Sequence, residues 1–226
     1  MATTPADAPE DVDRDAAARG TVYRTLAAAF RYPDEEFHAA ATSGALQRDL
    51  RECLDQTALA VEAPDLTTDD DYETLAARYN DLFELGYSEY TDRTDGSLDS
   101  SGPPVPLYES KYRPDQSWND VNLDLARAYD HYGLEIDQDR RDNHDALRYE
   151  LEFAGYLARR EAVVGTDAAL ARLDFQDRHL GHAAAGVADR LADEPGTDIY
   201  GPLGAFLESF VRADWNDLAD RLEGSR

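Results

Sequence analysis

The sequence is short of several residue types: among its 226 residues it has one cysteine, one lysine and two isoleucines. A single cysteine, Cys53, excludes an intrachain disulfide and a thiolate cluster for zinc or iron–sulfur chemistry. No run approaches the ~20 apolar residues of a membrane span, so membrane insertion is not expected. Valine and isoleucine total 11 against 60 alanines and leucines, and this imbalance predicts an all-α fold.

Positive charge is also scarce, with 22 Lys and Arg residues against 48 Asp and Glu residues and a net charge of −26. An acidic surface of this kind excludes nucleic acid and anionic membranes as partners. Asp outnumbers Glu by 32 to 16 and the only lysine is Lys111, a pattern typical of a halophilic cytoplasm near molar salt. There the Debye length is about 3 Å, so most of the charge is interpreted as solvated surface. The first residues lack the basic and apolar regions of a secretory signal, which favours a cytoplasmic protein.

Apolar residues recur at helical spacing along most of the chain, and no strand pattern competes with them. Residues 1–13 are interpreted as an acidic tail, and 14–226 as one all-helical globular domain of about eight or more helices. Leu173 and Leu180 are expected to face inward. Helices are expected before Pro33, over 34–60 with a break at Ser43-Gly44, over 70–85 after an N-cap at Thr68 or Asp69, after an N-cap at Ser117, and over 143–164, 167–192, 199–211 and 215–222.

Residues 86–116 are predicted to form a long loop. The run Gly102-Pro103-Pro104-Val105-Pro106 is incompatible with regular structure, yet Tyr108 and Tyr112 follow it closely. Long loops inside compact domains are uncommon and tend to be functional or disordered. The aromatic residues in the second half of this loop favour ordered packing there.

Sequence patterns of catalysis are missing: there is no glycine-rich phosphate loop and no nucleophile elbow, so an enzyme is not expected. His179 and His182 stand three residues apart on a predicted helix and would share one face. They therefore leave open a helical metal-binding protein, although a single His-x-x-His pair is a weak signal and favours one packed and one exposed histidine. A generic helical adaptor without a specific ligand is a further alternative.

Two features rise above this background. The first combines residues 79–83 (Tyr-Asn-Asp-Leu-Phe) with residues 106–112 (Pro-Leu-Tyr-Glu-Ser-Lys-Tyr), and the second is Asn143-His144 ahead of a helix that carries Glu150. Glu150 falls on the inward side of that helix, where a carboxylate is costly unless it is paired. Two interpretations stay open for it: a bond to a buried arginine or tyrosine, or a place in the wall of a binding groove.

In this order and spacing, these segments resemble the TorD-like redox-enzyme chaperones, the group that includes DmsD and NarJ. In that family a helix with Tyr-x-x-Leu-Phe precedes a loop with Pro-x-Tyr-x-Ser, as residues 79–83 and 106–110 do here. A histidine-containing hinge then leads into a Glu-Leu-x-Phe helix, which residues 144 and 150–153 match. The family hinge is often Glu-Pro-x-Asp-His, whereas this chain has Arg140-Arg141-Asp142-Asn143-His144.

The resemblance implies an all-α chaperone without catalysis and without a cofactor or metal of its own. Its implied partner is the precursor of a molybdopterin oxidoreductase catalytic subunit, of the dimethyl-sulfoxide-reductase or nitrate-reductase type. Such chaperones commonly bind the twin-arginine leader and hold the precursor until the cofactor is inserted; a homodimer is left open. Carboxylates beside an apolar groove suit a leader with two guanidinium groups and an apolar helix. The implied client-binding residues are Tyr79, Leu82, Phe83, Pro106, Tyr108, Glu109, Ser110, Tyr112, Asn143, His144, Glu150 and Phe153.

Overall fold

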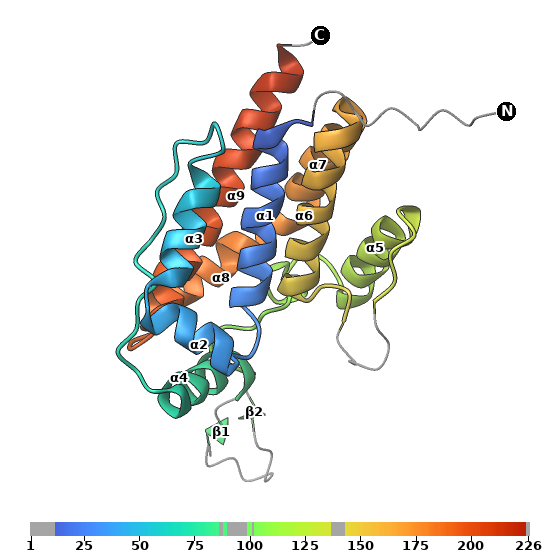
Figure 1. Cartoon of the computed structure of the whole chain (residues 1–226). Helices are drawn as coiled ribbons and strands as arrows, with labels where there is room; N and C mark the ends of the chain where they lie inside the picture. Colours follow the sequence, from blue (N-terminus) through green and yellow to red (C-terminus); the bar gives the residue numbers. More distant parts are fainter. Residues whose placement is uncertain (1–11, 86–87, 90–98, 101, 137–142, 225–226) are drawn as a thin grey trace, which may run out of the picture.

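The computed structural model describes residues 12–85, 88–89, 99–100, 102–136 and 143–224. Most of the expected tail at 1–13 and the hinge residues Arg140, Arg141 and Asp142 lie outside these described residues. The expected all-α class is confirmed, as Figure 1 shows. The α-helices are α1 (Arg14–Ala29), α2 (Glu35–Thr42), α3 (Ala45–Leu54), α4 (Tyr72–Tyr79), α5 (Trp118–His131), α6 (Leu147–Val164), α7 (Thr166–Phe175), α8 (Gly181–Asp193) and α9 (Tyr200–Glu223).

Shorter elements connect these helices. α4 continues into the π-helical turn η1 (Asn80–Glu84), and the similar turn η4 (Gln176–Leu180) joins α7 to α8 without a break. The described part of the expected loop contains the 3₁₀ helix η2 (Glu109–Tyr112). It also contains two antiparallel strands of two residues each, β1 (Ser88–Glu89) and β2 (Asp99–Ser100), which leave the all-α class unchanged.

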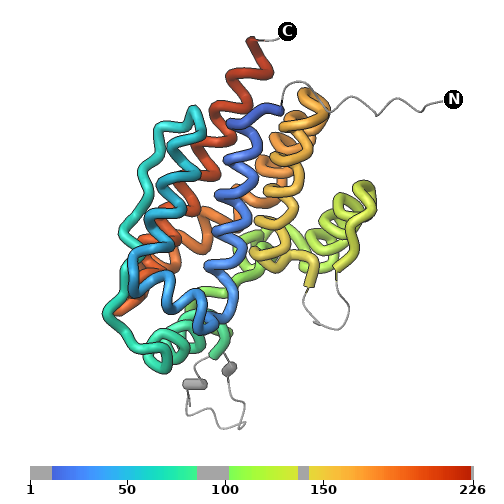
Figure 2. The backbone as a smooth tube through the Cα atoms, in the orientation of Figure 1, coloured from blue at the N-terminus to red at the C-terminus, as the bar shows by residue number. Residues whose placement is uncertain are grey.

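The helix α1 lies at the centre of the bundle beside α6, with α3 and α9 on its other side (Figure 1). Two glycines permit the close approach of α1 and α6. A Cβ atom on Gly20 would lie 3.0 Å from the carbonyl oxygen of Gly155 and 2.8 Å from Cγ of Arg159. The irregular residues 55–71 return along the outside of α3 to reach α4, as the tube in Figure 2 makes clear. None of the helices in the described ranges is both long and apolar enough to cross a bilayer.

A buried ionic cluster ties α1, α7 and α9 together in the core. Asp214 accepts hydrogen bonds from Arg19 (2.9 Å) and from the hydroxyl of Tyr23 (2.6 Å), and it also pairs with Arg172. Burial alone would raise the pKa of Asp214, but Arg172 and Arg19 hold it below its ordinary value. Because these charges are fully buried, each depends on its partners, and the cluster fixes how the three helices meet.

Several boundaries follow the expected residues. Gly44 adopts a left-handed conformation (φ 70°) between α2 and α3, as the break at Ser43-Gly44 predicts. Ser117 caps α5 by accepting a hydrogen bond from the backbone of Asp120. The predicted helix over 167–192 is also confirmed as the continuous run of α7, η4 and α8.

Other boundaries differ from the prediction. The N-cap of α4 is Asp71, which accepts a bond from the backbone of Thr74 at 2.8 Å, and not Thr68 or Asp69. The expected break between 199–211 and 215–222 is wrong because α9 is continuous and buries Asp214 in the ionic cluster. Leu173 is only half-buried, since Arg172 takes the inward position next to it.

Candidate functional site

Two segments that the sequence singled out lie against each other at the start of α6. Tyr108 and Ala146 form an antiparallel bridge, and the backbone of Leu147 donates to the carbonyl of Leu107 at 2.9 Å. The backbone of Glu109 donates in turn to the carbonyl of Asp145, also at 2.9 Å. These bonds hold residues 143–146 outside the helix, so α6 begins at Leu147 rather than at 143 as predicted.

This contact brings three buried carboxyl groups together: Glu109, Asp145 and Glu150. We call these three residues, together with Arg113 and His179, the acid junction. Nη1 of Arg113 lies 2.7 Å from one carboxylate oxygen of Glu109, and Nδ1 of His179 lies 2.9 Å from the other. Glu109 is thus fully engaged, with a guanidinium on one oxygen and an imidazole on the other.

The other two carboxyl groups of the acid junction have fewer partners. One oxygen of Asp145 accepts a bond from the backbone of Ser110 at 3.2 Å, and the other has no partner among the described residues. Glu150 is completely buried, and neither of its oxygens has a hydrogen-bond partner in the described part of the chain. Such groups are rare, because an unpaired buried carboxyl loses the hydrogen bonds that water would give it.

The electrostatics of the acid junction determine the state of Glu150. Burial, followed by the nearby charges of Glu109 and Asp145, raises the pKa of Glu150 well above its ordinary value, while Arg113 opposes this shift. These influences favour the protonated, neutral form of Glu150. A cation brought close to Glu150 would favour the ionised form instead.

The predicted client-binding residues fall into two groups of six. Those with a partly exposed surface all come from the two segments in contact at the acid junction: Pro106, Tyr108, Ser110, Tyr112, Asn143 and His144. The other six are buried: Tyr79, Leu82, Phe83, Glu109, Glu150 and Phe153. The twelve residues do not line one open groove.

The buried aromatic members of this set serve two different packing clusters. The rings of Tyr79 and Phe83 pack against Tyr200, at 5.9 and 5.2 Å between ring centroids, and the Tyr79 hydroxyl donates to the carbonyl of Phe30. Phe153 instead packs edge-on against Tyr129 and Phe175. Tyr79, Phe83 and Phe153 thus belong to the hydrophobic core and do not form part of the surface of the site.

Sequence reasoning missed several contributors to the acid junction. Asp145 and Arg113 belong to none of the sequence motifs, although the position of Arg113 four residues after Glu109 was a usable indication of pairing. Asn122 from α5 was also missed; its side-chain oxygen accepts a bond from the backbone of Asp145 at 3.3 Å. The loop, α5, α6 and η4 all contribute to the site.

The two histidines of the metal-binding alternative have separate environments. His179 lies between Glu109 and Asp124, with its Nε2 3.2 Å from a carboxylate oxygen of Asp124. His182 is exposed, and partial burial followed by the charge of Arg113 lowers its pKa. Within the described ranges, no group of three or more His, Cys, Asp or Glu residues is placed to hold a metal ion.

Comparison with known proteins places the chain in a family. The model of the nitrate reductase delta subunit family matches residues 38–182, more than half of the chain. The chain therefore belongs to this family, and the resemblance to the TorD-like group that includes NarJ is confirmed.

Curated relatives give the family a more specific character. A selenate reductase assembly chaperone protein of Thauera selenatis is 32% identical over 83% of this chain and 84% of its own length. A chlorate reductase assembly chaperone protein of Ideonella dechloratans is 31% identical over 68% of this chain and 75% of its own length. A perchlorate reductase assembly chaperone protein of Dechloromonas aromatica is 26% identical over 76% of each chain. All three are named as chaperones rather than as catalysts.

A solved structure also resembles this chain. It is described as a redox enzyme maturation protein from Archaeoglobus fulgidus, and it is 20% identical in sequence. The match covers 86% of this chain and 93% of that chain, with a TM-score of 0.48.

Proposed function

We propose that this protein is a cytoplasmic assembly chaperone that binds the precursor of a molybdopterin oxidoreductase catalytic subunit and holds it for cofactor insertion. The observation that carries this proposal is the similarity, at 31–32% identity over most of the chain, to assembly chaperones of selenate and chlorate reductases. The names of the family and of the three relatives all refer to reductases of oxyanions. The client proposed here is accordingly an oxyanion reductase, closer to the nitrate-reductase type than to the dimethyl-sulfoxide-reductase type.

The client-binding surface is proposed to lie over the acid junction. Its outer layer is the partly exposed set formed by Pro106, Tyr108, Ser110, Tyr112, Asn143 and His144. Directly beneath it are the carboxyl groups of Glu109, Asp145 and Glu150. Tyrosines suit this task because a rigid apolar ring contacts the peptide while the hydroxyl keeps a polar partner.

A twin-arginine leader fits this layering because the acid junction has more carboxyl groups than cations. A guanidinium group that entered beside Glu150 would find three carboxyl oxygens, two on Glu150 and one on Asp145, that have no partner among the described residues. Its charge would lower the pKa of Glu150 and favour a carboxylate paired with the guanidinium. Entry requires residues 106–112 to move outward, because these carboxyl groups are fully covered.

Close pairing of this kind also suits a protein with a net charge of −26. In molar salt a diffuse acidic field is screened within about 3 Å. Bidentate contacts between a guanidinium and a carboxylate act at hydrogen-bond distance and are therefore less affected by salt. Recognition is expected to depend on the geometry of arginine and not only on positive charge.

The test is a binding titration with a synthetic leader peptide that carries two adjacent arginines followed by an apolar segment. We expect at least tenfold weaker binding when both arginines are replaced by lysine, and a similar loss with Tyr108→Ala. Trp118→Ala is the control, because this aromatic residue is exposed but lies at the start of α5, outside the proposed surface. Light scattering on the same samples decides whether the chaperone is a homodimer.

Equal affinity for the arginine and lysine peptides would contradict leader recognition and favour a generic adaptor. A loss of binding with Trp118→Ala as large as that with Tyr108→Ala would contradict the proposed surface. Stoichiometric zinc, iron or manganese in the purified protein would instead favour the metal-binding alternative at His179 and His182.

A further inference from the structure

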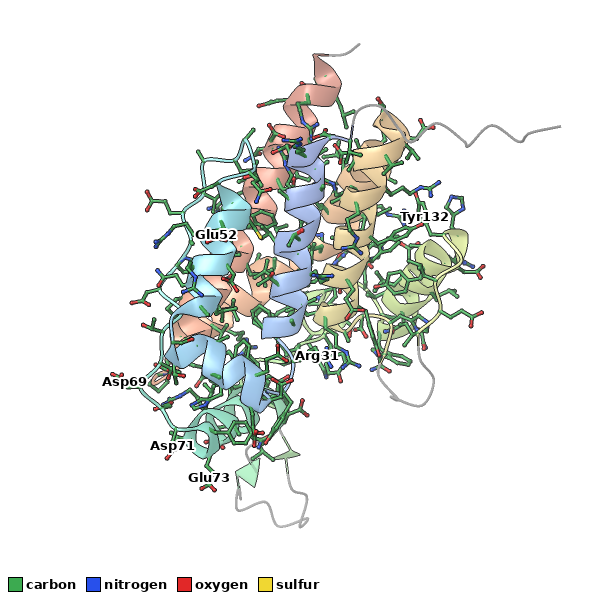
Figure 3. All side chains as sticks on the ribbon, in the orientation of Figure 1. Arg31, Glu52, Asp69, Asp71, Glu73 and Tyr132 are labelled. Atoms are coloured by element: carbon green, nitrogen blue, oxygen red, sulfur yellow. The ribbon has the colours of Figure 1, made fainter. Side chains whose placement is uncertain are left out.

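A groove of about 660 Å³ lies between α1, α6 and the residues that follow α5. Its floor and walls include the rings of Tyr149 and Tyr156 from α6, and both rings are half-buried. Three arginines line it as well: Arg24 from the second half of α1, Arg31 just beyond the end of α1, and Arg159 from α6. Figure 3 labels Arg31, which follows the end of α1.

Among the described residues, the arginines of this groove have no ion-pair partner. None of the three forms an ion pair with a carboxylate of the described chain, although the protein has more than twice as many acidic as basic residues. The nearest polar contact is the long one from Arg159 to the carbonyl of Gly20, at 3.5 Å. Partial burial and then the charge of Arg24 lower the pKa of Arg159, so these two guanidinium groups repel each other. An anion between them would relieve this repulsion.

Two acidic residues, Glu135 and Glu152, also line the groove. Both are exposed, and neither lies within ion-pair distance of the three arginines. They limit where an anion can bind, since an incoming carboxylate is repelled near them and attracted near Arg24 and Arg159. The groove therefore has a basic side, which an acidic ligand would contact.

The dimensions of the groove suit an extended polypeptide. From Tyr149 to Arg159 the helix α6 advances ten residues, or about 15 Å, which is the length of four or five extended residues. Along α1 the rise from Arg24 to Ala29 is about 8 Å, and Arg31 lies two residues further on, so about three extended residues would reach from one arginine to the other. The half-buried tyrosines provide apolar contact area between the charged ends.

We infer that this groove binds an extended acidic segment of the client, with two carboxylates three residues apart and an apolar or aromatic side chain between them. One carboxylate is placed between Arg24 and Arg159, and the other at Arg31. This inference rests on the proposed chaperone function, but it assigns a second contact with charge opposite to that of a twin-arginine leader. The two contacts would hold the client at two points of its chain.

The test is fluorescence anisotropy with a labelled peptide that has the core Asp-Tyr-Leu-Asp, compared with the same peptide in which both Asp are replaced by Asn. We expect at least tenfold tighter binding of the acidic peptide, and at least a tenfold loss with Arg24→Gln or Arg159→Gln. Arg31→Gln should cost severalfold, because it removes one of the two contacts. Arg48→Gln is the matched control, since Arg48 is an exposed arginine on α3.

Each result has a defined meaning. Equal affinity for the two peptides, no binding of either, or an equal loss with Arg48→Gln would overturn the inference. Pyrophosphate that binds with the same dependence on Arg24 and displaces the peptide at equal concentration would also overturn it, in favour of a small-anion site. The leader titration is repeated on Arg24→Gln, where affinity should be unchanged. If the unmodified protein does not distinguish the arginine leader from the lysine leader but still binds the acidic peptide, only the proposed leader recognition is contradicted.

Discussion

Glu150 is the residue for which the sequence raised two interpretations and the structure adds the most information. Its helical position predicted an inward carboxyl group, with either a buried partner or a groove as the explanation. The structure shows it fully buried and without a hydrogen-bond partner among the described residues. A single sequence could not reveal this, because Asp145 and Glu109, which raise its pKa, come from other segments. Retaining such an acid costs stability and therefore points to a use.

Glu150→Gln is expected to make the protein more stable at neutral pH. The pKa of Glu150 is higher in the folded than in the unfolded chain, so its contribution to stability is fully present below about pH 4.5 and is lost as the pH rises towards its folded value. The loss amounts to at most about 1.4 kcal/mol per pH unit. Glutamine stays neutral and removes this loss. Urea unfolding of both proteins between pH 5 and pH 8 measures the difference.

Glu152→Gln provides the control for this prediction, because Glu152 lies two residues further along the same helix and is exposed. Its stability should follow the wild-type pH dependence. If Glu150→Gln shows the same slope as the wild type from pH 5 to pH 8, Glu150 is ionised in the folded protein and the account of the acid junction fails.

At the scale of elements, the sequence predicts best where local chemistry decides. Ser117 and Gly44 mark helix boundaries because capping and left-handed backbone depend on the residue itself. Prediction from the sequence fails where a residue distant in the chain determines the structure. Helix α9 continues through Asp214 because Arg19 and Arg172 pair with that carboxylate in the core. The candidate site follows the same rule. The two motifs were recognisable, but Arg113, Asp145 and Asn122 join it only through tertiary packing.

Helix α8 supports the loop of the proposed client-binding surface through one glycine. A Cβ atom on Gly186 would overlap the ring of Tyr112, whose hydroxyl donates to the carbonyl of Pro106 at 2.7 Å. Gly186→Ala is therefore expected to displace residues 106–112. Leader affinity should fall severalfold and the melting temperature should drop, even though alanine favours a helix by about 1 kcal/mol over glycine. The leader titration and near-UV circular dichroism measure both effects.

Asp189→Ala tests the alternative explanation, a general effect of changing α8. Asp189 is exposed on the same helix, and its replacement improves helix propensity without a contact to Tyr112. This variant should bind the leader as the wild type does. A Gly186→Ala protein with wild-type affinity and an unchanged near-UV spectrum would show that Tyr112 does not position the loop.

On the scale of the whole molecule, the buried ionic cluster and the surface differ in how their charges are balanced. In that cluster Arg19 and Arg172 both pair with Asp214, so its members screen one another. The chain as a whole carries −26, so its unmatched carboxylates are mainly at the surface, where only ions in solution can screen them. The stability of the fold should therefore depend on salt mainly through the surface charges, while salt should have little effect on the pairing within the core cluster.

This arrangement predicts that potassium chloride raises the free energy of unfolding. Most of this increase should occur at the lower concentrations of a salt titration. The Debye length falls from about 10 Å at 0.1 M to about 3 Å at 1 M, so surface repulsion is largely screened by the upper concentration. A gain of about 2 kcal/mol would raise the melting temperature by about 4–8 °C for a chain of this size. Sucrose is the control, because it is excluded from the protein surface but carries no charge, and its effect should lack the steep early rise. If potassium chloride and sucrose give the same gradual increase, solvent exclusion explains the stabilisation and surface repulsion does not limit this fold.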